Sequence, residues 1–301
     1  MTLHPQPVQR RARALTLGAW SVTLAISAVP DIAFHLVTGA VPLWLTTAKV
    51  LLLLALGGLA LSWRRLRPLG GYLVALFAML SLSEARASVD FSWLPLQALF
   101  GNSVFDQRMQ AEQTGKLVVA LGVIAVLLAL GLKRRDFFLT RGNLQARIGP
   151  VPLLGFPKPD PWPRFGLQWG LYIAVALAIV QYLGIQPAAT VWPRLLPLAP
   201  SILFYAALNA FNEELTYRAP MLATLEPLIG GRQALWMSAF FFGIAHYFGT
   251  PGGLVGGVLS IFMGWILGKG MLETRGLFWS WWIHVLSDIA LFTFLAAQLV
   301  A

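Results

Sequence analysis

The sequence predicts an all-α fold, a polytopic transmembrane helical bundle of about eight to nine spans. Hydrophobic residues make up 57% of the 301-residue chain and charged residues 11%, and the mean hydropathy is +0.70. A soluble domain carries about a quarter charged residues, so this composition indicates an integral membrane protein. The chain has no cysteine, which excludes disulfides and thiolate metal ligands.

Apolar segments of membrane-spanning length recur along the whole chain. A helix needs about 20 apolar residues to cross a bilayer. The nine candidate spans are 15–37, 43–62, 69–86, 116–132, 166–186, 196–217, 234–250, 252–270 and 277–299. The first of these is expected to be a retained span rather than a cleaved signal peptide, because it is too long and poorly terminated for one.

Basic residues cluster beside these spans. The clusters are RRAR at 10–13, RRLR at 64–67 and KRR at 133–135. Cytoplasmic loops carry an excess of Lys and Arg, so we expect a multi-pass protein of the cell membrane with its N-terminus in the cytoplasm and its C-terminus outside. The net charge of +10 then reflects topology, and no nucleic-acid partner is expected.

The chain divides by the character of its polar residues. Residues 1–165 are expected to form an N-terminal helical region ending in a cytoplasmic juxtamembrane loop that lies against the lipid headgroups. Residues 166–301 are expected to form a second transmembrane region, which holds most of the unusual polar residues. No internal repeat is visible in the sequence.

Eight ionisable side chains fall inside the expected spans. They are Asp31, His35, Lys49, Glu213, Glu214, His246, His284 and Asp288. Each costs at least about 2.5–3.5 kcal/mol at the bilayer centre, and those that persist usually face a cavity or a partner. Five of the eight lie in the last third of the chain, which makes that region the candidate site.

The segment NAFNEELTYRAP, 209–220, places two adjacent glutamates in an apolar region. On a helix Glu214 and Arg218 are four residues apart and can pair. Glu213 is rotated by about 140° from Arg218, so we expect it to point elsewhere, without that partner and available for chemistry. The alternative is that both acids only cap or solvate a helix end near the cytoplasmic face.

The remaining candidates also leave alternatives open. His246 is a catalytic imidazole or an interhelical hydrogen-bonding residue. His284 and Asp288, four apart on the last span, are two metal ligands, a donor pair at an oxyanion, or a histidine held by its aspartate. Asp31 and His35 have the same spacing, and we expect a structural contact. No HExxH or GxSxG motif occurs, which excludes a zincin helix and a serine nucleophile elbow.

Three ordered motifs carry a family resemblance. They are Glu213-Glu214-x-x-x-Arg218, Phe242-x-x-x-His246 and His284-x-x-x-Asp288, the last preceded by the context ETRGLFWSWWIHVLSD. They resemble the signature of the CAAX-protease and bacteriocin-processing (CPBP) family, also called Abi. Its members are polytopic intramembrane endopeptidases related to the Rce1-like prenyl-protein proteases. The resemblance covers roughly residues 195 to 300 and implies a polar catalytic cavity within the bilayer.

The resemblance also implies roles for the matching residues. Glu213 and His246 would activate the attacking water, and His284 and Asp288 would stabilise the oxyanion or bind a metal. Structural support would come from Glu214, Arg218 and Phe242. Prenyl-protease members have asparagine where this chain has Asp288, and an ionised aspartate accepts hydrogen bonds rather than donating them.

Two mechanisms and several substrates follow from the resemblance. A divalent metal such as zinc would have Glu213, His246, His284 and Asp288 as its ligands, whereas a glutamate-type protease needs no metal. The substrate would be a membrane-anchored or lipidated protein or peptide. A non-catalytic membrane scaffold or a proton-coupled transporter is the alternative function.

Geometry sets a condition on the catalytic hypothesis. Glu213 lies as deep in the membrane as the histidines only if its helix continues past Arg218 to about Leu222–Leu225. We therefore predict that this helix is kinked near Pro220 and does not end at Tyr217. Glu213 must also lie within roughly 10 Å of at least one histidine. The Gly-rich segment 249–270 is expected to let helices pack closely.

Overall fold

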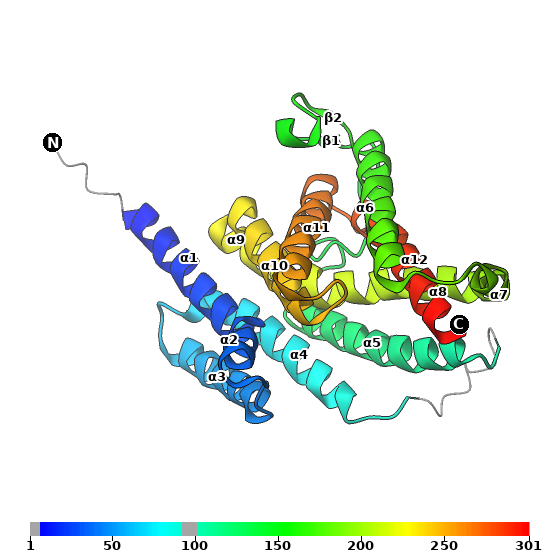
Figure 1. The fold of residues 1–301 in the computed structure, drawn as a ribbon. Helices are drawn as coiled ribbons and strands as arrows, with labels where there is room; N and C mark the ends of the chain where they lie inside the picture. The colour runs from blue at the N-terminus through cyan, green and yellow to red at the C-terminus, as the bar shows by residue number, and fades with distance from the viewer. Residues whose placement is uncertain (1–6, 92–100, 301) are drawn as a thin grey trace. The chain divides into compact units, whose positions relative to one another are not determined.

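The structure, a computed structural model, describes residues 7–91 and 101–300. The described residues form α-helices, short 3₁₀ and π turns, and one antiparallel two-stranded ribbon in which Arg147 pairs with Pro161 (Figure 1). The predicted all-α polytopic bundle is confirmed.

The elements follow one another in a simple order. Up to residue 129 they are α1 (Pro7–Ile26), α2 (Val29–Thr38), α3 (Trp44–Ser62), α4 (Gly70–Ala87) and α5 (Val104–Ala129). The middle of the chain has β1 (Arg147–Ile148), β2 (Asp160–Pro161), α6 (Trp162–Ile185), α7 (Trp192–Leu195), α8 (Ala199–Glu213) and a π turn (Glu214–Arg218). The last elements are α9 (Ala219–Ile229), α10 (Gly231–Ala245), α11 (Gly253–Thr274) and α12 (Phe278–Val300).

Among the described residues, seven helical segments are long and apolar enough to cross a membrane, and a bent pair, α1 with α2, brings the number to eight. Eight of the nine expected spans correspond to these segments. The ninth, 234–250, does not, because α10 has only 15 residues and ends at Ala245. A straight helix of that length extends about 22 Å, short of the ~30 Å hydrocarbon core.

Helix α5 begins well before the expected span 116–132. It starts at Val104, so the segment DQRMQAEQTGK, which the expected spans leave almost entirely outside the membrane as a loop, belongs to a membrane-length helix. Asp106, Gln110 and Gln113 occur at the spacing of one helix face, and all three are buried. Their polarity hid this half of the helix from a hydropathy-based prediction.

The helix that carries the two glutamates continues past Arg218, as predicted. Its irregularity is the π turn Glu214–Arg218, which ends two residues before Pro220, and α9 then runs on to Ile229. Pro220 has no backbone N–H to donate to the carbonyl one turn earlier, so the regular helical ladder cannot pass through this position unchanged. Single π turns inside α-helices occur frequently at functional sites.

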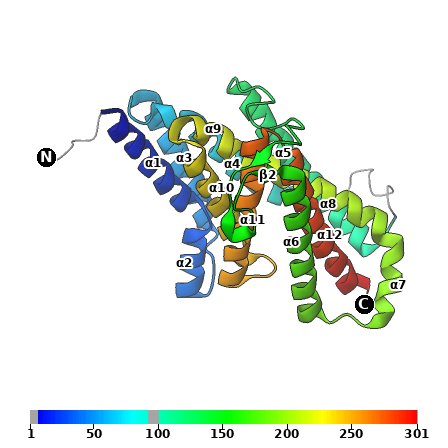
Figure 2. The same ribbon diagram turned by 90° about the horizontal axis from the view of Figure 1, so that it is seen from above.

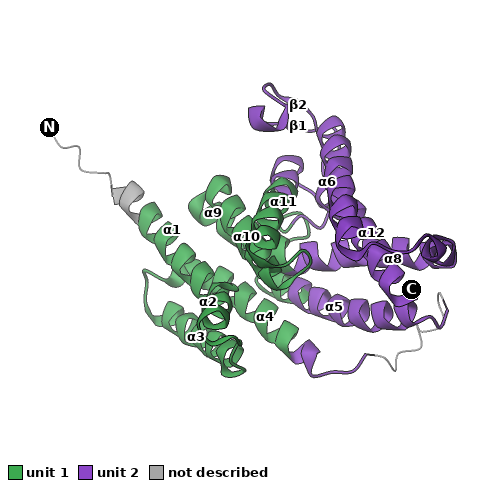
Figure 3. Cartoon of the chain, viewed as in Figure 1, with its two compact units in different colours: residues 1–84, 125–137, 217–268 green, residues 85–124, 138–216, 269–301 purple. Residues whose placement is uncertain are grey.

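The chain forms two compact units, each assembled from three separate segments (Figure 3). Unit 1 consists of 1–84, 125–137 and 217–268, and unit 2 of 85–124, 138–216 and 269–301. The division of the sequence at residue 165 stays a prediction.

In unit 1, glycines bring α10 and α11 together. A methyl group on Gly243 would lie 2.2 Å from the backbone nitrogen of Ile261, and one on Gly264 would lie 3.2 Å from the Cα of Ala239. Gly264 belongs to the Gly-rich segment for which close packing was predicted, and that prediction is confirmed here. Such small residues at helix contacts are typical of membrane bundles.

In unit 2, α12 packs against both α6 and α8, and α6 and α12 lie side by side in both views (Figures 1 and 2). A methyl group on Gly166 of α6 would lie 2.4 Å from the Trp279 ring of α12. The opposite face of α6 exposes large apolar side chains, namely Leu167, Leu171, Val175 and Ile179. A regular apolar stripe left exposed on one helix face is what contact with lipid requires.

The centre of unit 2 is an apolar cluster shared by three helices. Phe105 and Met109 come from α5, Ile202 and Ala206 from α8, and Phe292 and Ala296 from α12. This cluster fixes the three helices against one another, and Lys116, Asn209, Glu213, His284 and Asp288, described below, lie on the same three helices.

Two loops of unit 2 also contact each other closely. The Asn143 backbone N–H donates to the Thr274 carbonyl at 2.8 Å, and a methyl group on Gly276 would lie 2.3 Å from the Cα of Gly142. Gly142 has φ +74°, a conformation that favours glycine. The loops 140–143 and 274–277 are therefore held together.

Candidate active site

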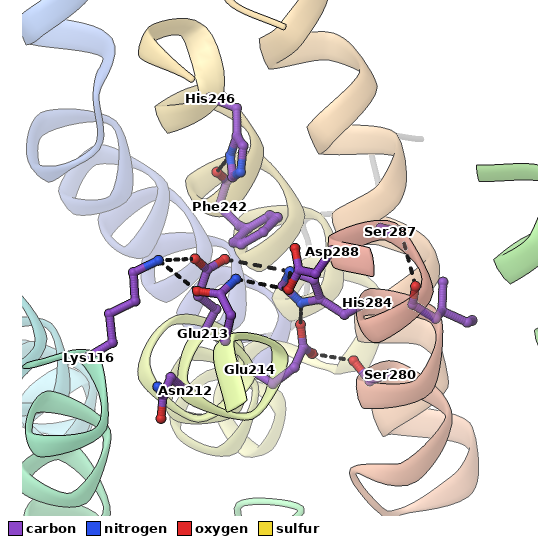
Figure 4. A network of polar contacts seen from close by, with 12 residues as sticks. Lys116, Asn212, Glu213, Glu214, Phe242, His246, Ser280, His284, Ser287 and Asp288 are labelled. Atoms are coloured by element: carbon purple, nitrogen blue, oxygen red, sulfur yellow. Dashed lines mark hydrogen bonds and ion pairs between the residues drawn. The ribbon is translucent and has the colours of Figure 1, made fainter. Parts of the chain in front are cut away.

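Glu214 is the buried end of a hydrogen-bonded row between α8 and α12. Its carboxylate is fully buried, accepts a hydrogen bond from Ser280 Oγ, and lies 2.9 Å from His284 Nδ1 (Figure 4). Ser280 and His284 are four residues apart on α12 and so present their polar atoms to one side. Glu214 thus holds two positions of the last helix.

His284 is oriented by this contact. An ionised carboxylate only accepts hydrogen bonds, so the proton on Nδ1 points to Glu214. The other ring nitrogen, Nε2, lies 3.6 Å from Glu213 Oε2 and 3.7 Å from Asp288 Oδ2. These separations are longer than a direct hydrogen bond and leave Nε2 directed at the two carboxylates. The condition that Glu213 lie near a histidine is therefore met by His284.

The position of Glu213 on its helix predicted no partner for this carboxylate, but the structure gives it one. Lys116 of α5 donates to Glu213 Oε1 at 2.9 Å (Figure 4). The Glu213 side chain keeps 15% exposure, whereas that of Glu214 has none. The expectation that Glu213 has no partner is therefore wrong, and its availability for chemistry stays a prediction.

Asp288 is bound through an amide of α8. Asn209 Nδ2 donates to Asp288 Oδ2 at 2.9 Å, and Asn209 Oδ1 accepts from Lys116 Nζ at 2.7 Å and from Gln113 Nε2 at 2.9 Å. Asn209 lies four residues before Glu213, on the same face of α8. The aspartate is therefore an acceptor in this network, as its chemistry predicts.

Several of these residues were missed from the sequence. Lys116, Gln113, Asn209 and Ser280 all join the network, yet none was selected as a candidate. The available signal was the regular spacing of polar residues along α5, which the assignment of this segment to a loop concealed. Asn209 offered a weaker signal, as a polar residue one turn before Glu213.

Unit 1 holds the other three predicted residues. The Arg218 guanidinium lies 4.4 Å from the centre of the Phe242 ring, a cation–π geometry, and Arg218 is fully buried. The Phe242 and His246 rings are 4.7 Å apart, and His246 Nδ1 lies 3.0 Å from the Phe242 carbonyl oxygen. The four-residue spacing of this motif thus sets the orientation of His246. The expected pair of Glu214 with Arg218 joins the two units and stays a prediction.

The first-span candidates have structural partners in unit 1. Lys49 Nζ donates to Asp31 Oδ2 and to the Ser27 carbonyl, at the break between α1 and α2. The His35 ring packs edge-on against Tyr247 and Phe248. The contacts of Asp31 and His35 are thus with other residues, whereas a contact between the two was expected.

The fit of a metal ion can be tested on the donor groups. Across 7–91 and 101–300, no group of three or more His, Asp or Glu side chains is arranged to hold one. Glu213 has an ammonium group at 2.9 Å, and Asp288 accepts from an amide. These residues as placed do not fit the expected zinc set, so no step of the reaction proposed below passes through a metal ion.

Comparison with known protein families relates one segment of the chain to a family of endopeptidases. No curated protein and no solved structure matches the chain. Residues 195–290 match the family described as type II CAAX prenyl endopeptidase Rce1-like. This range contains all three motifs, so the resemblance predicted from them is confirmed. The part of the chain that carries Glu213, His246, His284 and Asp288 is therefore similar to the Rce1-like CAAX prenyl endopeptidase family.

Proposed function

We propose that this protein is a CAAX-type intramembrane endopeptidase that hydrolyses a peptide bond of a membrane-anchored, lipidated protein. The observation that carries the proposal is the row Glu214–His284–Glu213, in which one carboxylate orients an imidazole whose other nitrogen faces the second carboxylate. An oriented imidazole beside a carboxylate is the arrangement that general acid–base chemistry requires.

In the first step, Glu213 takes a proton from a water molecule while the water oxygen bonds to the scissile carbonyl carbon. The carbonyl oxygen gains the negative charge. His284 acts in its positively charged form, with protons on both ring nitrogens. Its Nε2–H group donates a hydrogen bond to this oxyanion, and Asp288 and Glu214 balance the positive charge on the ring. A donor placed in advance where charge develops typically contributes about 10²–10³-fold in rate.

In the second step, the tetrahedral intermediate collapses and the carbon–nitrogen bond breaks. The proton held by Glu213 passes to the leaving amine, so one water is consumed and a carboxylic acid and an amine are released. Following the family pattern, His246 is assigned to water activation with Glu213, and Arg218 and Phe242 are assigned to its support. The exposed apolar helices are consistent with a substrate presented within the bilayer.

The test uses purified full-length protein in detergent. The probe is a farnesylated peptide ending in a CAAX sequence, and release of the terminal tripeptide is measured by mass spectrometry, with and without a chelator. The proposal expects cleavage of the prenylated peptide at least ten times faster than of the unprenylated one. Cleavage that the chelator abolishes would make the protein a metalloprotease.

Other outcomes would change the assignment. Cleavage of a membrane-anchored leader peptide but not of the prenylated one would keep the endopeptidase and replace the substrate, as in leader trimming, bacteriocin self-immunity or maturation of a signalling peptide. No cleavage of either peptide would favour the scaffold or transporter.

We also propose an orientation, with the N-terminus in the cytoplasm and the C-terminus outside. Loop 130–161 holds the KRR cluster and is assigned to the cytoplasm. The contact between loops 140–143 and 274–277 supports the same side for both. Helix α12 then crosses to the outside. With α6 and α11 as spans, residues 189–252 must start and end on the outer side, so the segment Ala189–Ile229 enters the membrane and α10, which is too short to be a full span, leads the chain back.

This orientation can be tested because the chain has no cysteine. A single cysteine in place of Lys158, which is exposed in the 130–161 loop, should be protected from a membrane-impermeant maleimide in intact cells. One appended to the C-terminus should be labelled. Detergent should make both reactive, and equal labelling of the two in intact cells would contradict the orientation.

A further inference from the structure

The Glu213 carboxylate is held by a cation that comes from outside the family-matched region. Lys116 lies on α5, whereas the match covers 195–290. Its ammonium lies 2.9 Å from Glu213 Oε1, 2.7 Å from Asn209 Oδ1 and 3.3 Å from Glu112 Oε1. An ammonium has three N–H donors and no acceptor, so three acceptors around it match its hydrogen-bonding capacity.

Lys116 is connected to both carboxylates that face His284. It contacts Glu213 directly and reaches Asp288 through Asn209, whose Nδ2 donates to Asp288 Oδ2. Without a cation on this side, Glu213, Glu214 and Asp288 would place three negative charges around one imidazole. Like charges at such separations repel strongly in a low-dielectric interior.

We propose that Lys116 is a positioning residue for peptide hydrolysis, which holds the Glu213 carboxylate toward His284 and supplies the counter-charge of the site. This inference rests on the proposed function. Lys116 engages Oε1 of Glu213, and the other oxygen, Oε2, faces His284 Nε2. The lysine therefore fixes which oxygen of the carboxylate is presented to the imidazole.

The exposure of the two groups supports a role in the site rather than in the core. The Lys116 side chain is 23% exposed and that of Glu213 is 15% exposed, so neither side chain is fully enclosed by the protein. Such a partly exposed pair stabilises a fold little. Loss of the ammonium should therefore affect the orientation of the base more than the stability of the protein.

The test replaces Lys116 by cysteine, which is then the only cysteine in the chain. The variant is expected to lower kcat about 100-fold with little change in KM, because a base displaced by about 1 Å loses that much. Treatment with 2-bromoethylamine makes the thiolate displace bromide and leaves an aminoethyl thioether, a lysine analogue with sulfur in place of one methylene. This should restore kcat to within a few-fold of wild type.

Three controls make the result specific to the charge. Iodoacetamide, which adds a neutral group, should not restore activity. Lys158→Cys, at an exposed position of the same unit, should keep wild-type activity before and after 2-bromoethylamine. Intact mass verifies each alkylation, and melting temperatures in detergent are compared. Lys116→Arg should exceed Lys116→Met by at least tenfold in kcat, which tests the charge independently of alkylation.

The outcomes separate this inference from the function on which it rests. If wild type cleaves and Lys116→Cys retains a third or more of its kcat, Lys116 is not a positioning residue. Restoration by the neutral reagent, or equal activity of the Arg and Met variants, overturns the charge requirement. If wild type cleaves no peptide, the proposed function itself fails.

Discussion

Replacing Glu213 by glutamine is expected to lower kcat/KM for peptide cleavage by about 10²–10⁴-fold, the usual contribution of a general base. Glutamine has the same shape, and its carbonyl oxygen can still accept from Lys116. Its amide cannot take a proton from water. The side chain keeps 15% exposure, so the exchange leaves no fully buried group without a partner.

The measurement pairs the cleavage rate with the melting temperature in detergent. Glu213→Gln should melt within a few degrees of wild type while losing activity, and Glu226→Gln, on α9, is the control expected to keep both. A Glu213→Gln protein that retains more than a tenth of wild-type kcat/KM would show that Glu213 is not the base. A scaffold function predicts no effect of this exchange on assembly.

The sequence was sufficient for the fold class and for the position of the site. Spans such as α3 and α12 are apolar along their length, and length with hydropathy identifies them. The motifs identified Glu213, Glu214, His284 and Asp288, which the structure brings together in unit 2. The sequence was enough to predict a span where the signal is a run of apolar residues, and a candidate residue where the signal is a fixed spacing.

Contacts between side chains of different helices could not be predicted from hydropathy or residue spacing. A spacing argument considers only residues of the same helix, so it offered Glu214 a single partner, Arg218, and none from another helix. The structure gives Glu214 two partners from α12, Ser280 and His284, which lie 66 and 70 residues away. Lys116 is a similar case, 97 residues before Glu213. A buried polar face such as that of α5 lowers hydropathy and is easily mistaken for a loop.

Replacing Glu214 by glutamine is expected to reduce both stability and activity. The carboxylate accepts from Ser280 Oγ and His284 Nδ1 in a fully buried position. Glutamine has one accepting oxygen, and its amide nitrogen only donates. Either one buried donor loses its acceptor, at about 1–3 kcal/mol, or the amide donates to Nδ1 and the proton of a neutral ring moves to Nε2.

The loss of the positively charged ring makes the loss of activity large. A neutral His284 with its proton on Nε2 can still donate to the oxyanion, but the ring carries no positive charge to stabilise it, because no carboxylate remains at Nδ1 to balance one. We expect a loss of at least about 10²-fold here, with a lowered melting temperature.

Ser280→Ala is the matched comparison, because it removes the other partner of Glu214 and leaves the contact with His284 in place. Its loss of kcat/KM should be at least tenfold smaller than that of Glu214→Gln, with a destabilisation of about 1 kcal/mol. Cleavage rate and melting temperature of both variants, measured beside Glu213→Gln, then separate the two glutamates. A Glu214→Gln protein as stable and active as wild type would mean that this carboxylate neither orients His284 nor holds α12, and the row on which the mechanism rests would not operate.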